Sequence, residues 1–80
     1  MLKLYQFMDC PYCERVRQKM SELGLEYEKI EVDYDLAKRP SVVLEKNHGR
    51  VPVLDDHGQI IVESALIVQY LENKYGSPKG

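Results

Sequence analysis

The sequence predicts a small α/β domain built on a mixed four-stranded sheet. A strand, a helix and a second strand follow one another within about thirty residues, which is the pattern of a βαβ unit with parallel strands. The second half adds two short apolar runs joined by a turn, which is the pattern of an antiparallel hairpin. Helices after the second strand and after the hairpin complete the order β-α-β-α-β-β-α, and we expect residues 1–80 to form a single domain.

The first strand is predicted at residues 2–7, with Leu2 and Leu4 on one face and Tyr5 and Phe7 on the other. Apolar side chains on both faces indicate a strand that is covered on both sides. We therefore expect helices above and below the sheet.

The first helix is predicted to begin at Pro11, which is tolerated in a first helical turn, and to end at Gly24. Between these two residues Val16, Met20 and Leu23 recur at the i, i+4, i+7 spacing of one helix face. This face is expected to pack on the sheet.

A second strand is predicted at residues 27–32, with Ile30 and Val32 pointing inward. Acidic residues surround these positions, which suits an edge strand that charge protects from pairing with another chain: Glu26, Glu28, Glu31 and Asp33. A short second helix is then predicted with Pro40 at its first position and with an end near residues 47–49; its apolar residues are Val43 and Leu44.

The hairpin strands are predicted at residues 53–55 and 60–62, separated by turn residues 56–59. The last helix is predicted to follow a Ser64 cap and to end at Gly76. Its apolar stripe is expected to consist of Ile67, Tyr70 and Leu71.

Composition restricts the classes of function. The chain carries thirteen acidic and eleven basic residues, and its longest basic run is the pair Lys38-Arg39, so nucleic acid is not an expected partner. No apolar stretch approaches the length of a membrane span, and the first residues run directly into a strand pattern without a signal peptide. We expect a monomeric cytoplasmic protein with no membrane partner.

Both cysteines of the chain lie in the run Cys10-Pro11-Tyr12-Cys13, where the first strand turns into the first helix. Residues at i and i+3 are neighbours on a helix, close enough for a disulfide to form and break. Cys10 also meets the unpaired N–H groups and the positive end of the helix dipole, which favour its thiolate and allow its sulfur to accept hydrogen bonds. We expect Cys10 to be the nucleophile and Cys13, one turn deeper, to be the resolving thiol.

Metal ligation and inert packing are the other two interpretations of the cysteine pair. A metal site needs more ligands than the pair provides. The only two histidines, His48 and His57, fall in predicted loops, where we expect them to be solvated turn residues. We therefore expect no bound metal.

Two parts of the sequence resemble known families. Residues 4–17, which contain the cysteine pair, resemble the active-site segment of glutaredoxins. Residues 49–55, followed by residues 63–67, resemble the N-terminal thioredoxin-fold domain of glutathione S-transferases. The resemblance implies a thioredoxin fold, a cis Val51-Pro52 bond facing the cysteines, no bound cofactor, and glutathione or another low-molecular-weight thiol as co-substrate. From the residues alone, Pro52 would simply open a strand where no N–H donor is needed.

The resemblance also implies residues that would bind glutathione. The backbone of Val51 would pair with the extended peptide, Ser64 and the helix N-terminus would hold the γ-glutamyl carboxylate, and Glu63 would hold the ammonium group. On sequence alone, Glu63-Ser64 is equally a capped helix start with an acidic neighbour. Tyr12 is expected to lie exposed beside Cys10 as a contact surface, and an aromatic residue that simply starts the helix is the equal alternative.

The glycine carboxylate of glutathione needs a cation. Glutaredoxins commonly carry a lysine two residues before the first cysteine, but Met8 stands there in this chain, and Asp9 adds negative charge beside the cysteine pair. Arg50, with Lys38 and Arg39 as the other candidates, could supply this cation, although a solvated surface charge is the more common role for each of the three.

The leading hypothesis is a glutathione-dependent thiol-disulfide oxidoreductase, similar to glutaredoxins, that reduces protein disulfides or glutathione mixed disulfides. The alternative is a glutathione-binding domain of the transferase N-terminal type, whose reaction with electrophiles usually requires an all-helical second domain. Tyr5 resembles the catalytic tyrosine of some transferases, but we expect it to pack in its strand. A thiol-binding or metal-binding module without turnover is the third hypothesis.

Overall fold

The computed structural model describes residues 2–76, and its elements follow the predicted order. The strands are β1 (Leu2–Gln6), β2 (Glu28–Glu31), β3 (Val53–Asp56) and β4 (Gln59–Val62). The helices are α1 (Pro11–Glu22), α2 (Ser41–Asn47) and α3 (Ser64–Tyr75), with a short 3-10 helix, η1 (Leu36–Lys38), before α2.

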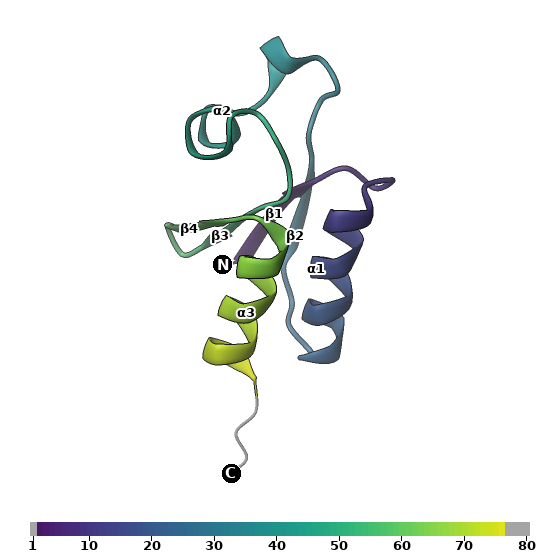
Figure 1. The fold of residues 1–80 in the computed structure, drawn as a ribbon, viewed down its shortest axis with the longest axis vertical. Helices are drawn as coiled ribbons and strands as arrows, with labels where there is room; N and C mark the ends of the chain where they lie inside the picture. The colour runs from purple at the N-terminus through teal and green to yellow at the C-terminus, as the bar shows by residue number, and fades with distance from the viewer. Residues whose placement is uncertain (1, 77–80) are drawn as a thin grey trace.

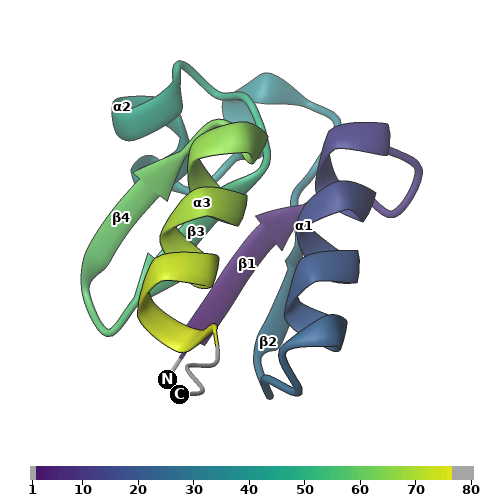
Figure 2. The same cartoon turned by 60° about the horizontal axis from the view of Figure 1, so that its bottom comes forward.

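The four strands form one sheet in the order β2-β1-β3-β4. β1 is parallel to β2 and antiparallel to β3, and β3 and β4 form an antiparallel hairpin. Helices α1 and α3 lie side by side over one face of the sheet, and α2 lies apart from them (Figures 1 and 2). The predicted mixed sheet, the βαβ unit and the thioredoxin-like fold are confirmed, with β2 at the expected edge.

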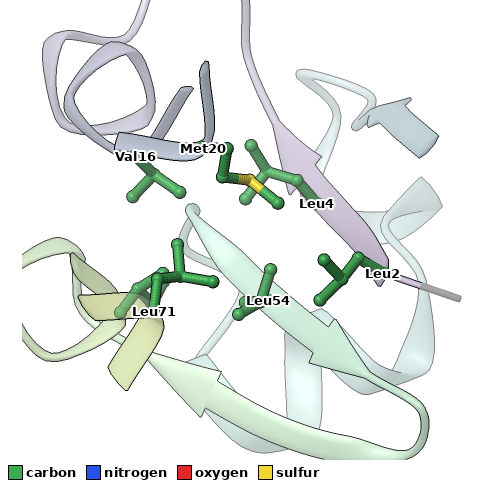
Figure 3. Close-up of a cluster of buried hydrophobic side chains, with 7 residues drawn as sticks. Leu2, Leu4, Val16, Met20, Leu54 and Leu71 are labelled. Carbon is green, nitrogen blue, oxygen red and sulfur yellow. The ribbon is translucent and has the colours of Figure 1, made fainter. Parts of the chain in front are cut away.

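The larger core lies between the sheet and helices α1 and α3. Leucines from β1 and β3 meet the buried face of α1 and one face of α3 (Figure 3). The fully enclosed side chains of this core are Leu2, Leu4, Val16, Met20, Leu54, Ile67 and Leu71. The predicted apolar faces of β1 and of both helices therefore account for most of it.

A smaller core covers the opposite face of the sheet. Val43 of α2 packs there with Val32 and Val53. Tyr5 and Phe7 join this core with part of their surfaces, as the two-faced pattern of β1 predicts. The packing role expected for Tyr5 is consistent with this placement.

The second half of the chain corrects three details of the predicted elements. Pro40 is the residue before α2 rather than its first residue, because its ψ of 147° is extended. Leu44 is 37% exposed and so is not a core residue, because α2 turns only Val43 fully inward. The hairpin turn is only His57-Gly58, which both have positive φ, so Asp56 is the last residue of β3.

The start and stripe of α3 also differ from the prediction. Ser64 is the first helical residue, and Glu63 is the residue before the helix, with a φ of 73° and no side-chain capping hydrogen bond. The chain reverses at Glu63 to enter α3, which leaves Ser64 buried instead of at the cap. Ile67 and Leu71 are buried as predicted, whereas Tyr70 is half-buried and donates its hydroxyl to Asp56.

Candidate functional site

Helices α1 and α3 both begin at one end of the sheet, which is the upper end in Figure 2. A cleft of about 460 Å³ lies where these helix starts meet the end of α2 and the segment before β3. Nine residues line it: Tyr12, Arg15, Asn47, Arg50, Val51, Pro52, Glu63, Ser64 and Ala65. Of the eight site residues predicted from the sequence, all but the two cysteines line this cleft.

The cysteines differ in exposure as predicted. Cys10 is half-buried at the N-cap of α1, and Cys13 is fully buried with a free thiol. Burial raises the pKa of the Cys13 thiol to about 12; a backbone hydrogen bond from Phe7 opposes this shift, and interaction with Cys10 adds to it. The expectation that the Cys10 sulfur accepts capping hydrogen bonds is wrong, because its side chain makes none.

The segment before β3 presents a free stretch of backbone to the cleft. The Val51-Pro52 peptide bond is cis, as the family resemblance implied. Within residues 2–76, the N–H and C=O of Val51 bond to no other backbone group. Val51 is half-buried beside the buried Pro52. Because its backbone groups have no backbone partner among the described residues, this edge is available to an extended ligand at the cleft wall.

Glu63 and Ser64 line the cleft at the start of α3. Glu63 is exposed, whereas Ser64 is buried, with only 8% of its surface exposed and the free N–H groups of the first helical turn beside it. A carboxylate next to a helix N-terminus offers an acceptor for a cation and donors for an anion within a few ångströms. This pair suits a ligand that carries both charges.

Two arginines line the cleft from other elements. Arg50 lies in the loop before β3, and Arg15 lies on α1, one turn after Tyr12. Asn47 fixes the Arg50 loop, since its side chain donates to the Arg50 carbonyl at 3.0 Å. The lining therefore carries two cations and one anion, and its net charge of +1 suits a ligand of net charge −1.

The other predicted cations lie elsewhere. Arg39 donates to the carbonyls of Asp33, Tyr34 and Gly49 at 2.7–2.9 Å, so its guanidinium is committed to backbone. Lys38 is exposed on η1 and does not line the cleft.

Three lining residues, Arg15, Asn47 and Ala65, were not predicted from the sequence. Arg15 lies three positions after Tyr12 on α1, and this helical spacing was a usable signal. Asn47 and Ala65 line the cleft only because the end of α2 and the start of α3 converge there. Nothing in the local sequence indicates that convergence.

Among the residues that the structure describes, no group of three or more His, Cys, Asp or Glu side chains is arranged to hold a metal ion. None of the helices within residues 2–76 has the length and apolar character needed to cross a membrane.

Comparison with known proteins gives one consistent family. Residues 4–79 match the family model described as glutathione S-transferase, N-terminal domain. A probable glutathione S-transferase of Nicotiana tabacum is 37% identical over 79 residues, which are 96% of this chain and 34% of that protein.

Solved structures agree with this match. A diazinon-metabolizing glutathione S-transferase of the silkworm Bombyx mori superposes with a TM-score of 0.85 and 39% identity, over 98% of this chain and 40% of that one. A rice glutathione S-transferase in complex with glutathione superposes with a TM-score of 0.84 and 36% identity, over 96% of this chain and 35% of that one. This chain thus spans about a third of the length of the curated relatives it matches.

Proposed function

The chain belongs to the family of glutathione S-transferase N-terminal domains, and from this premise we propose that it binds glutathione in the cleft and exchanges thiols through Cys10. The comparisons support the transferase part of the resemblance; the glutaredoxin part has the support of the shared thioredoxin-like fold and the cysteine pair. The observation that carries the proposal is the arrangement of charge and free backbone in the cleft beside the start of α1.

Glutathione has two carboxylates and one ammonium group, so its net charge of about −1 at neutral pH complements the cleft lining. The Glu63 carboxylate would bind the ammonium group, and the Ser64 end of α3 would bind the neighbouring carboxylate. The Val51 backbone would pair with the central cysteinyl residue, as in strand addition. Arg50 would bind the glycine carboxylate in place of the lysine that Met8 replaces.

This placement directs the glutathione sulfur toward the start of α1. The Cys10 thiolate would attack the sulfur of a glutathione mixed disulfide and release the substrate thiol. A second glutathione thiolate would then attack the bound glutathionyl sulfur, expel Cys10 as a thiolate and leave as glutathione disulfide. The helix dipole stabilises Cys10 as the leaving group in this second step.

A glutathione-coupled disulfide reduction assay tests the proposal. We expect Cys10→Ser to reduce turnover at least about a hundredfold, because no other described thiol is accessible. Cys13→Ser should retain reduction of glutathione mixed disulfides and lose reduction that requires the dithiol. Equal loss from both variants, or full activity in Cys10→Ser, would contradict the proposed role of Cys10.

Conjugation of glutathione to an electrophile is a second candidate function, favoured by the relatives named as transferases. In this function Cys10 would stabilise the glutathione thiolate without forming a disulfide. Conjugation of chlorodinitrobenzene distinguishes the two candidates, since Cys10→Ser would retain that reaction while losing disulfide exchange. The relatives are about three times longer than this chain. The electrophile that accepts the glutathionyl group is therefore part of this proposal and is not assigned to a site in the described domain.

A further inference from the structure

A polar network reaches from the interior of the sheet to the loop that carries Cys10. Its members are Gln6 on β1, Arg17 on α1 and Glu31 on β2, which we call the loop clamp. We propose that the loop clamp positions Cys10 against Cys13, so that Arg17 governs whether a glutathionylated Cys10 closes to the intramolecular disulfide. This inference rests on the proposed thiol exchange and goes beyond it.

Arg17 binds the loop through backbone carbonyls. Its guanidinium donates to the Phe7 carbonyl at 3.4 Å and to the Met8 carbonyl at 3.2 Å. The same group donates to Gln6 Oε1 at 2.6 Å. A planar guanidinium can serve three acceptors in fixed directions, which a single ammonium group cannot do.

Gln6 anchors the network in the core. Its side chain is 1% exposed, and a buried amide without partners would be strongly unfavourable. Its nitrogen donates to Glu31 Oε1 at 3.2 Å while its oxygen accepts from Arg17, so the amide joins the two charged side chains. A polar residue at this otherwise apolar strand position is difficult to explain by packing alone.

Glu31 holds the loop from the other side. Its second oxygen accepts the Met8 N–H at 2.9 Å. Arg17 and Glu31 therefore hydrogen-bond to the two backbone polar groups of Met8, Arg17 to the carbonyl and Glu31 to the N–H. These two hydrogen bonds fix the Met8 backbone, although the Met8 side chain is 57% exposed.

The loop that Arg17 and Glu31 hold is hydrogen-bonded to Cys10. The Cys10 N–H donates to the Phe7 carbonyl at 3.3 Å, which is the carbonyl that Arg17 also binds. The Phe7 backbone also acts on the Cys13 thiol, whose pKa it lowers against the larger effect of burial. Movement of the Phe7 peptide would therefore displace one cysteine relative to the other.

Closure of the disulfide is the step that depends on this placement. The Cys13 thiolate attacks Cys10 Sγ, the Cys10–Cys13 bond forms, the Cys10–glutathione bond breaks, and glutathione leaves as a thiolate that takes up a proton. In this step Cys13 is oxidised, Cys10 remains part of a disulfide, and the glutathione sulfur is reduced to the thiol. Because Cys13 is buried and protonated at neutral pH, its attack relies on proximity to Cys10 more than on a standing thiolate.

The test measures how the intermediate partitions. The reduced full chain is mixed with a glutathione and glutathione disulfide buffer and quenched in acid, and the mixed and intramolecular disulfides are counted by intact mass. We expect Arg17→Met to raise the ratio of mixed to intramolecular disulfide about tenfold. Arg17→Lys should give an intermediate ratio, and Glu31→Ala should raise the ratio by a smaller factor because Arg17 remains.

Lys29→Met is the matched control, because it removes an exposed cation from β2 next to Glu31 and should leave the ratio unchanged. Wild-type ratios in both Arg17→Met and Glu31→Ala would overturn the role of the clamp while leaving the proposed thiol exchange intact. Failure of the wild type to form any mixed disulfide would overturn the proposed exchange, and the clamp role with it. If Arg17→Met does not fold, Glu31→Ala at the exposed sheet edge decides the question.

Discussion

Glu63 combines an exposed carboxylate with a backbone conformation that side chains rarely adopt. Its φ of 73° lies in the region that favours glycine, and a non-glycine residue there is strained by about 1 kcal/mol or more. The conformation lets the chain enter α3 with Ser64 as its first residue while the Glu63 carboxylate lines the cleft. The proposed function gives a reason for glutamate, and not glycine, at this position.

Replacing Glu63 by two small residues separates strain from binding. We expect Glu63→Ala and Glu63→Gly to raise the dissociation constant for glutathione by the same factor, about tenfold, because both lose the charge-assisted bond to the ammonium group. Glu63→Gly should be about 1 kcal/mol more stable than Glu63→Ala, because only glycine adopts this φ without strain. Calorimetric titration and urea unfolding measure the two quantities.

Gln69, exposed within α3, provides the control for this pair of substitutions. There the order should reverse, with alanine more stable than glycine by about 1 kcal/mol, and glutathione binding should not change. Unaltered binding in Glu63→Ala would show that the carboxylate does not contact the ligand.

Helix α3 is attached to the sheet at its far end by a buried carboxylate. The Asp56 side chain at the end of β3 is fully buried, and it accepts hydrogen bonds from Tyr70, Tyr75 and Lys74 of α3, the last at 2.9 Å. His57 Nδ1 also lies 2.6 Å from Asp56 Oδ1. Burial alone would raise the pKa of Asp56, but these hydrogen bonds outweigh it and hold the pKa well below its usual range.

Asp56→Asn should therefore destabilise the attachment of α3. We expect the free energy of unfolding at pH 7 to fall by about 2–3 kcal/mol, because the amide loses the charge that Lys74 and the tyrosines bind. The folded pKa is depressed, so the contribution of Asp56 is present above its unfolded pKa of about 4 and is lost as the pH falls below it. The difference in the free energy of unfolding between wild type and Asp56→Asn should therefore shrink as the pH falls below about 4.

Urea unfolding at several pH values measures this difference. Glu26→Gln, at an exposed residue before β2, is the control and should change stability by less than about 0.5 kcal/mol. If the difference in unfolding free energy between wild type and Asp56→Asn stays the same in acid, packing and not charge accounts for the effect of Asp56.

At the scale of the whole molecule, the cleft is an assembly of four segments that are distant in the sequence. The starts of α1 and α3, the end of α2 and the loop before β3 each contribute part of its wall. A ligand that contacts all four segments connects α1 and α3 on one face of the sheet with α2 on the other face. Glutathione binding should therefore stabilise the entire domain cooperatively.

Glutathione at ten times its dissociation constant should add about 1.4 kcal/mol to the stability of the chain. For a domain of this size, the thermal midpoint should rise by about 5–10 °C. Cysteinylglycine at equal concentration should give a smaller shift, because it lacks the γ-glutamyl group that Glu63 and Ser64 would bind. Equal shifts from the two compounds, measured by circular dichroism, would place the γ-glutamyl group outside the cleft.

The order of elements was predictable because each is encoded locally. The two-faced pattern of β1, the helical repeat from Val16 to Met20 and the turn glycine Gly58 each depend on neighbouring residues alone. The same holds for Cys10, since its position at a helix start follows from Pro11 and the repeat after it. These features determined the fold class and the place of Cys10 at a helix start.

The buried polar residues and the cleft walls required the tertiary structure. The sequence predicts Asp56 as a turn residue and Gln6 as an ordinary strand residue. Both are buried in the structure, because their hydrogen-bond partners come from distant elements. Arg15 and Asn47 join the cleft for the same reason. The sequence by itself thus determined the dithiol and the elements that carry it, whereas only folding decided which charges surround it, because such contacts join residues that no local pattern connects.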